Sequence, residues 1–107
     1  MKIGIVISQN DPETVWNALR LANLAVNKGD IVSMFLTGKG VEYEQLSSPK
    51  FNIKEQVKKF LQSENAKIVA CGTCMAIRKQ NSSQECPAGG IEDLYRLITD
   101  SDKVITF

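Results

Sequence analysis

The chain has 107 residues, with 13 Lys or Arg and 12 Asp or Glu, so its formal net charge is only +1. This balance gives no electrostatic basis for binding nucleic acid or an anionic membrane surface, and we expect small molecules or other proteins as partners. No histidine is present, which excludes Ser–His and Cys–His catalytic pairs and restricts any zinc site to cysteine and carboxylate ligands.

Length and composition also bear on domain number and compartment. An apolar content of 43% over 107 residues is typical of one globular domain, which would cover residues 1–107. The longest apolar stretches are shorter than the roughly twenty residues that cross a bilayer, and the chain starts with a strand pattern instead of a signal peptide. Three cysteines, an odd number, are typical of reduced thiols, so we expect a cytoplasmic protein.

The first third of the chain predicts a strand, a helix and a second strand. Lys2–Ser8 is almost continuously apolar, as in a strand that is covered on both faces of a parallel sheet. Asp11 can cap a helix over residues 12–28, with Pro12 at its first position and a glycine after its end. A second apolar run, Ile31–Leu36, predicts the next strand.

Three apolar residues of this helix, Trp16, Leu21 and Leu24, lie partly outside its sheet-facing stripe. A wide core stripe within one subunit explains them, and so does burial against another subunit, because contiguous apolar surface often marks an interface. Together with Phe107, they lead us to expect a homo-oligomer.

The loop after the second strand, Thr37–Val41, carries Gly38, Lys39 and Gly40. Ligands of open α/β sheets bind beyond the carboxyl ends of strands, which places this loop on the same edge as Cys71. The glycines permit close backbone approach and Lys39 can meet an anion, so the three are candidate substrate-binding residues. The loop lacks a complete phosphate-loop pattern, and a solvated turn is the simpler explanation.

The rest of the chain continues the alternation of helices and strands. A short helix over 41–46 and a loop over 47–50 precede a helix from Asn52, whose apolar residues share one face. Ala66–Cys71 predicts the third strand, and a short helix then runs to about Lys79.

The last third predicts a polar segment over 80–85, the turn-like Cys86–Gly90, a helix over 91–99 and a final strand over 102–107. Four residues of this helix are expected to face the core: Ile91, Leu94, Tyr95 and Ile98. Strands that alternate with helices predict a three-layer α/β/α sandwich with a mainly parallel sheet of four or five strands.

Cys71 and Cys74 lie where the third strand gives way to a helix. An accessible thiolate there can attack a donor persulfide and carry its outer sulfur as a cysteine persulfide, without a general base. Arg78 lies seven residues after Cys71 and four after Cys74, so a helix brings its cation to roughly the same side as both thiols. Its candidate role is thiolate stabilisation, and a surface cation is the alternative.

Other readings of the three cysteines remain open. Two cysteines separated by two residues can close a disulfide, as in a dithiol oxidoreductase, although too little sequence follows them to complete a thioredoxin domain. Cys71, Cys74 and Cys86 can also bind metal, although structural zinc usually needs a fourth protein ligand. Cys86 alone fits a buried, apolar role.

With these residues considered, the chain resembles the DsrE/DsrF-like sulfur-relay family, and within it the YchN-like proteins. The resemblance is carried by Asn17–Ala22, by Phe51–Ile53, by Cys71-Gly72-Thr73-Cys74 with Arg78, and by Ser101–Phe107.

That resemblance implies an α/β/α sandwich, assembly into oligomers that are commonly trimers or hexamers, and a cysteine that accepts persulfide sulfur. The accepting cysteine corresponds to Cys71, whereas Cys74 matches the second cysteine of YchN-like members only. Family members usually have a longer segment with a fourth strand before the last helix, where this chain has the short Cys86–Gly90. The strand number therefore stays open.

We expect, on these grounds, a small DsrE-like protein that binds or relays sulfane sulfur on Cys71, with Cys74 as auxiliary thiol. It would exchange sulfur with donor and acceptor proteins or small sulfane-sulfur molecules, as a possible sulfurtransferase without metal or cofactor. The alternatives are a non-catalytic oligomeric protein that binds a small anion or thiol near Gly38–Gly40, and a dithiol redox protein.

Overall fold

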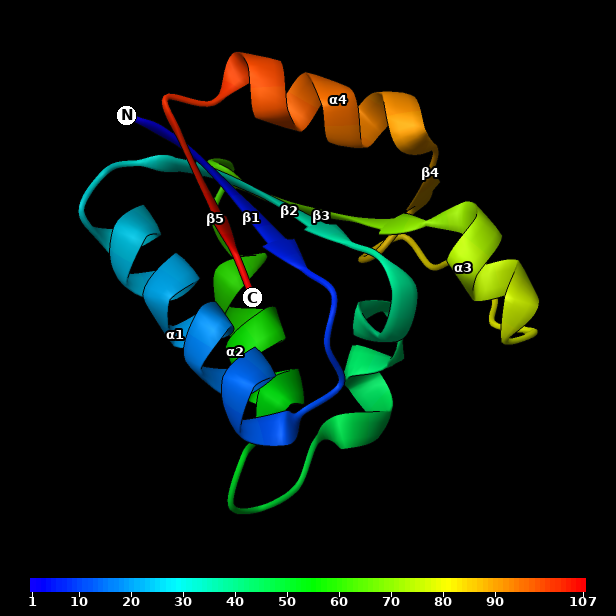
Figure 1. The fold of residues 1–107 in the computed structure, drawn as a ribbon. Coiled ribbons are helices and arrows are strands. Elements are labelled where there is room, and N and C mark those ends of the chain that lie inside the picture. Colours follow the sequence, from blue (N-terminus) through cyan, green and yellow to red (C-terminus); the bar gives the residue numbers. More distant parts are fainter.

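A computed structural model describes residues 1–107 as one all-parallel, five-stranded sheet with helices on both faces (Figure 1). The strands lie in the order β4-β3-β2-β1-β5 and comprise β1 (Lys2–Ile7), β2 (Ile31–Leu36), β3 (Ala66–Cys71), β4 (Ala88–Gly89) and β5 (Lys103–Thr106). The helices are α1 (Pro12–Asn27), the 3-10 helix η1 (Gly38–Leu46), α2 (Ile53–Phe60), α3 (Gly72–Ile77) and α4 (Ile91–Asp100). The predicted α/β sandwich is confirmed, with five strands.

Local sequence signals explain where the two long helices of one layer begin. The Asp11 carboxylate accepts the Thr14 backbone N–H at 3.0 Å, and Pro12 occupies the first turn of α1, where its missing N–H costs no hydrogen bond. The Asn52 side chain accepts the Glu55 N–H at 3.1 Å and caps α2 in the same way. Helix α1 stops before Gly29, whose φ of 94° is a conformation that glycine adopts readily.

The main hydrophobic core lies between the sheet and the layer formed by α1 and α2 (Figure 1). Alternate strand residues point into it, because side chains of a strand alternate between the two faces of a sheet. Its fully buried members include Ile5, Ile7, Val15, Leu19, Val32, Met34, Leu36, Ile53, Phe60 and Ile68.

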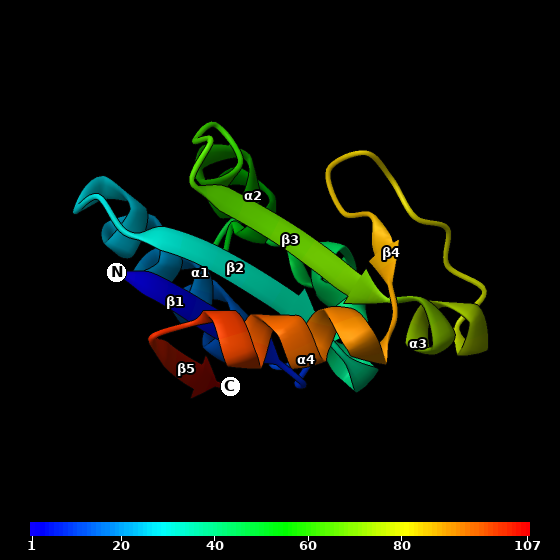
Figure 2. The same ribbon diagram turned by 90° about the horizontal axis from the view of Figure 1, so that it is seen from above.

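The opposite face of the sheet is covered by a single helix, α4, which packs on β1 and β2 (Figure 2). Leu97 is its only buried residue, at 8% exposed, and it packs over Gly4, where a Cβ atom would collide with it. The expectation that Ile91, Tyr95 and Ile98 face the core is wrong, because they are 76%, 67% and 50% exposed. One helix on a wide sheet can bury only the narrow stripe that faces the strands.

One further expectation is corrected, because the segment from Gly38 is the first turn of η1 and not a loop. The strand number, which the sequence leaves open, is five, because the residues after Cys86 include a two-residue strand, β4. Trp16, for which the sequence allows either a wide core stripe or a subunit interface, has partners within its own subunit. Its ring packs on Phe51 with centroids 5.5 Å apart, and the Arg20 guanidinium lies 4.5 Å above it.

Candidate functional site: a cysteine pair at the strand ends

The cysteine pair lies at the carboxyl edge of the sheet, where β2 and β3 end side by side. Leu36 is paired with Ala70 in the parallel ladder, so the next residues, Thr37 and Cys71, emerge at the same edge. Cys71 is the N-cap of α3, and Cys74 lies in the first turn of that helix. Both cysteines are half-buried, and no disulfide joins them. The parallel register therefore brings the residues after β2 onto the thiols that follow β3.

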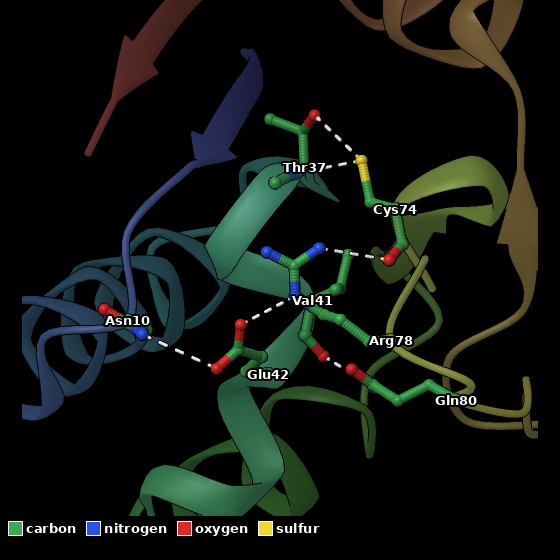
Figure 3. Close-up of polar contacts among 8 residues, drawn as sticks. Asn10, Thr37, Val41, Glu42, Cys74, Arg78 and Gln80 are labelled. Carbon is green, nitrogen blue, oxygen red and sulfur yellow. Dashed lines mark hydrogen bonds and ion pairs between the residues drawn. The ribbon is translucent and has the colours of Figure 1, made fainter. Parts of the chain in front are cut away.

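The sulfur of Cys74 contacts two polar groups from the residues that follow β2. The Gly38 backbone N–H donates to Cys74 Sγ at 3.2 Å, and Thr37 Oγ1 lies 3.9 Å from the same sulfur (Figure 3). Hydrogen bonding from the Cys71 thiol lowers the pKa of Cys74 most, followed by the bonds from Gly38 and Thr37 and the charge of Arg78. These contributions outweigh the partial burial of the group, so Cys74 is the more acidic thiol of the pair.

Cys71 has the opposite electrostatic character. Its Sγ accepts the Cys74 backbone N–H at 3.4 Å, the local bond expected of an N-cap side chain. Burial raises the pKa of Cys71 most, and the neighbouring Cys74 side chain raises it further. The pair therefore holds one proton preferentially on Cys71 and negative charge preferentially on Cys74.

Arg78 joins α3 to η1 and does not donate a hydrogen bond to either sulfur. Its Nε donates to Glu42 Oε2 at 2.6 Å and its Nη1 donates to the Cys74 carbonyl at 3.1 Å (Figure 3). The Arg78 guanidinium holds the pKa of Glu42 below its usual value. The positive charge of Arg78 also contributes to the lowered pKa of Cys74. Thiolate stabilisation by Arg78 therefore stays a prediction, and it would act through charge and not through a hydrogen bond to sulfur.

The three candidate substrate-binding residues have different surroundings. Gly38 lies at the site and offers its N–H to Cys74, whereas Gly40 is buried against the Ile7 carbonyl, where a Cβ atom would collide. Lys39 is exposed between them. Anion binding by this segment stays a prediction, while Gly40 has a clear packing role.

Cys86 is 4% exposed and belongs to the main core, beside Tyr43. Burial raises the pKa of its thiol. No group of three or more His, Cys, Asp or Glu side chains is arranged to hold a metal ion. The three cysteines therefore form a pair and a separate core residue.

Sequence reasoning did not identify Thr37, Glu42 or Gln80 at the site. Gln80 Nε2 donates to the Val41 carbonyl at 2.9 Å, which ties the segment after α3 to η1 (Figure 3). Thr37 had a usable signal, because it directly follows a strand that ends at the predicted ligand edge. Glu42 and Gln80 had none, since their partners lie 36 and 39 residues away in the chain.

The fold and the site together define the class of protein: a small α/β protein with a parallel sheet and a Cys-x-x-Cys thiol site at the carboxyl edge of that sheet. The chain belongs to the DsrE/DsrF-like family, whose model matches residues 1–107. Proteins of this family are sulfur-relay components and are often oligomeric.

Two solved structures share the fold. The YchN protein of E. coli is 22% identical, with a TM-score of 0.83 and full coverage of both chains. A conserved protein of unknown function from Bacteroides thetaiotaomicron, BT1422, is 19% identical with a TM-score of 0.75, over 99% of this chain and 94% of that one. No curated protein matches the sequence. None of the helices combines the length and hydropathy needed to span a membrane.

Proposed function

We propose that this protein binds or relays sulfane sulfur as a persulfide on the Cys71–Cys74 pair. The observation that carries the proposal is the pair itself, two half-buried thiols at a sheet edge, one of which accepts the Gly38 N–H and lies in hydrogen-bond contact with the Thr37 hydroxyl. An accessible thiolate is the group that attacks a persulfide, and neighbouring donors increase its population at neutral pH. Family membership supports the same chemistry.

The sulfur would come from a donor persulfide, either on a protein or on a small molecule, and would pass to an acceptor thiol. The resemblance noted above assigns the accepting role to Cys71, with Cys74 as auxiliary thiol and Arg78 as thiolate stabiliser. We propose that the chain acts in the cytoplasm as a homo-oligomer, with three or six copies, in keeping with the family's habit of assembly.

Intact-mass analysis tests the proposal. Reduced protein incubated with a small sulfane-sulfur donor should gain sulfur, seen as added sulfur atoms or as released sulfide. The double variant Cys71→Ser/Cys74→Ser should do neither, whereas Cys86→Ala should behave as the unmodified protein because Cys86 lies in the core. If the thiols react with alkylating agents but neither gain nor reduce sulfane sulfur, the non-catalytic anion-binding or thiol-binding alternative is favoured.

A further inference from the structure

The two thiols of the pair differ in what surrounds them. Cys74 Sγ receives the Gly38 N–H at 3.2 Å from a different strand end, with the Thr37 hydroxyl at 3.9 Å. Cys71 Sγ receives local backbone N–H groups from within its own helix turn, with the Cys74 N–H at 3.4 Å. Polar groups from a distant part of the chain, the Gly38 N–H donor and the Thr37 hydroxyl, therefore contact Cys74 and not Cys71. This asymmetry bears on which thiol reacts first.

We propose that Cys74 takes up the sulfane sulfur first and that Cys71 then releases it as sulfide, closing a Cys71–Cys74 disulfide. The inference rests on the proposed function and reverses the roles that the resemblance implies. It also assigns the pair a reaction, the reduction of sulfane sulfur by two thiols.

In the first step the Cys74 thiolate attacks the outer sulfur of a donor persulfide, R–S–SH. The donor S–S bond breaks, a new S–S bond forms to Cys74, and R–S⁻ leaves and takes up a proton as R–SH. The Gly38 N–H stabilises the attacking anion before the reaction. Cys71 stays protonated during this step because its environment favours the thiol.

In the second step the Cys71 sulfur attacks Sγ of Cys74 and displaces the terminal sulfur. The Cys74–S–SH bond breaks, a Cys71–Cys74 bond forms, and the Cys71 proton leaves with the terminal sulfur as H₂S. The two thiols lose two electrons and the sulfane sulfur gains them, so the step balances without an added oxidant. An external thiol or dithiol then reduces the disulfide for another cycle.

The spacing of the residues allows this closure. The two cysteines are separated by two residues, a spacing at which disulfides form readily. The bond from the Cys74 N–H to Cys71 Sγ holds the first sulfur against the turn that carries the second. Both thiols are half-buried and pack against the edge of the main core, outside its fully buried set.

Competitive alkylation of the unmodified reduced protein at neutral pH tests the order without any variant. Peptide mapping should find Cys74 alkylated several-fold faster than Cys71. Each unit by which its pKa is lower multiplies the thiolate fraction about tenfold, and lower basicity reduces nucleophilicity by about threefold. Faster alkylation of Cys71 would overturn the proposed order.

Single-cysteine variants test the two steps. Cys71→Ser should gain one sulfur and keep it as a persulfide on Cys74, because the resolving thiol is missing. Cys74→Ser should gain little sulfur, and the unmodified protein should release one sulfide per chain and lose two hydrogen atoms. Persulfide on Cys71 in the Cys74→Ser variant, with none in Cys71→Ser, contradicts the order but leaves the proposed function intact. Absence of sulfur uptake and sulfide release in all three proteins contradicts the proposed function itself.

Discussion

At the residue scale, Thr37 is the side chain that connects the end of β2 to the reactive sulfur. Its hydroxyl lies 3.9 Å from Cys74 Sγ and contributes to the lowered pKa of that thiol. The other contributors are the Cys71 thiol, the Gly38 N–H and the Arg78 charge, of which the thiol is the largest. Thr37 is the contributor that a near-isosteric substitution can remove without changing any charge.

Thr37→Val should therefore slow the alkylation of Cys74 at neutral pH by about threefold, since a lost hydrogen bond to an anion raises its pKa. The midpoint of the pH profile of alkylation should move upward. Thr99→Val, on the exposed face of α4, is the matched control and should leave the profile unchanged. If the pH profile of Thr37→Val coincides with that of the unmodified protein, the Thr37 hydroxyl does not lower the pKa of Cys74.

Cys86 should make the protein less stable at alkaline pH. Burial raises the pKa of its thiol above the usual value of 9.0, so the unfolded chain loses this proton at a lower pH than the folded chain. The stability due to the buried thiol is complete below the unfolded pKa and declines as pH rises through the folded pKa.

Denaturant unfolding between pH 7 and pH 10 should show this decline, at up to about 1.4 kcal/mol of unfolding free energy per pH unit. Cys86→Ala should decline less steeply, although burial also raises the pKa of Tyr43 and acts in the same direction in both proteins. Parallel curves for the two proteins would show that Cys86 does not titrate differently on folding.

Cys71, Cys74 and Arg78 could be selected from the sequence because their spacing is short and their chemistry is distinctive. The sequence could not show which of the two thiols is the more acidic, because that depends on Gly38, which lies 36 residues before Cys74. A backbone N–H leaves no signature in a sequence, and only the parallel register of β2 and β3 brings it to the sulfur.

At the scale of elements, the spacing of the apolar residues predicted four strands and the longer helices. Each of these strands contains a run of apolar residues, and each of these helices carries an apolar stripe along one face. Strand β4 escaped prediction because Ala88 and Gly89 have no preference for strands, and their pairing depends on neighbouring β3. Helix α4 was predicted but its orientation was only partly right. The spacing of apolar residues identifies the apolar face of a helix. It does not show how much of that face the sheet covers.

Helix η1 places the Gly38 N–H against Cys74, and the close packing of Gly40 on Ile7 holds η1 against the sheet. A Cβ atom at Gly40 would collide with the Ile7 carbonyl, so Gly40→Ala must displace η1. We expect a loss of at least about 2 kcal/mol in unfolding free energy. We also expect slower alkylation of Cys74 in the folded variant, as its N–H donor moves with the helix.

Gly90→Ala is the matched control for this substitution, because no atom lies within 4 Å of the position of its Cβ. It should change the alkylation rate little and should cost less stability than Gly40→Ala, the cost being that of a poorer N-cap for α4. Denaturant unfolding and alkylation kinetics measure the two effects, and a Gly40→Ala protein with unaltered stability would show that η1 is not held by this contact.

At the scale of the whole molecule, the helix that covers one sheet face alone carries exposed apolar residues. Ile91, Tyr95 and Ile98 are exposed on α4, and Val104 on β5 is also exposed. Exposed apolar residues that gather on one surface favour association. Leu21 and Leu24 on α1 are exposed as well, so the sequence-based expectation of an interface there is also testable.

Light scattering at micromolar concentration should give the mass of a trimer or hexamer. Tyr95→Glu should reduce that mass, since a charge cannot be buried in an apolar interface without a partner. Leu24→Glu on the other layer is the control and should leave it unchanged. A monomer mass for the unmodified protein would contradict the predicted assembly, and dissociation by Leu24→Glu alone would move the interface to α1.

The pairing of β1 with β5 has a consequence for how the protein is made. Lys2 donates its N–H to Asp102 at 2.7 Å across 100 residues of chain, and Ile3 is in register with Lys103. On the ribosome, β1 emerges before β5 and can pair early with β2, but its other edge stays open until residues 103–106 have left the ribosome. An open strand edge is a template for pairing with other chains. The growing polypeptide is therefore exposed to misassembly along β1, and protection of that strand matters until β5 has paired with it.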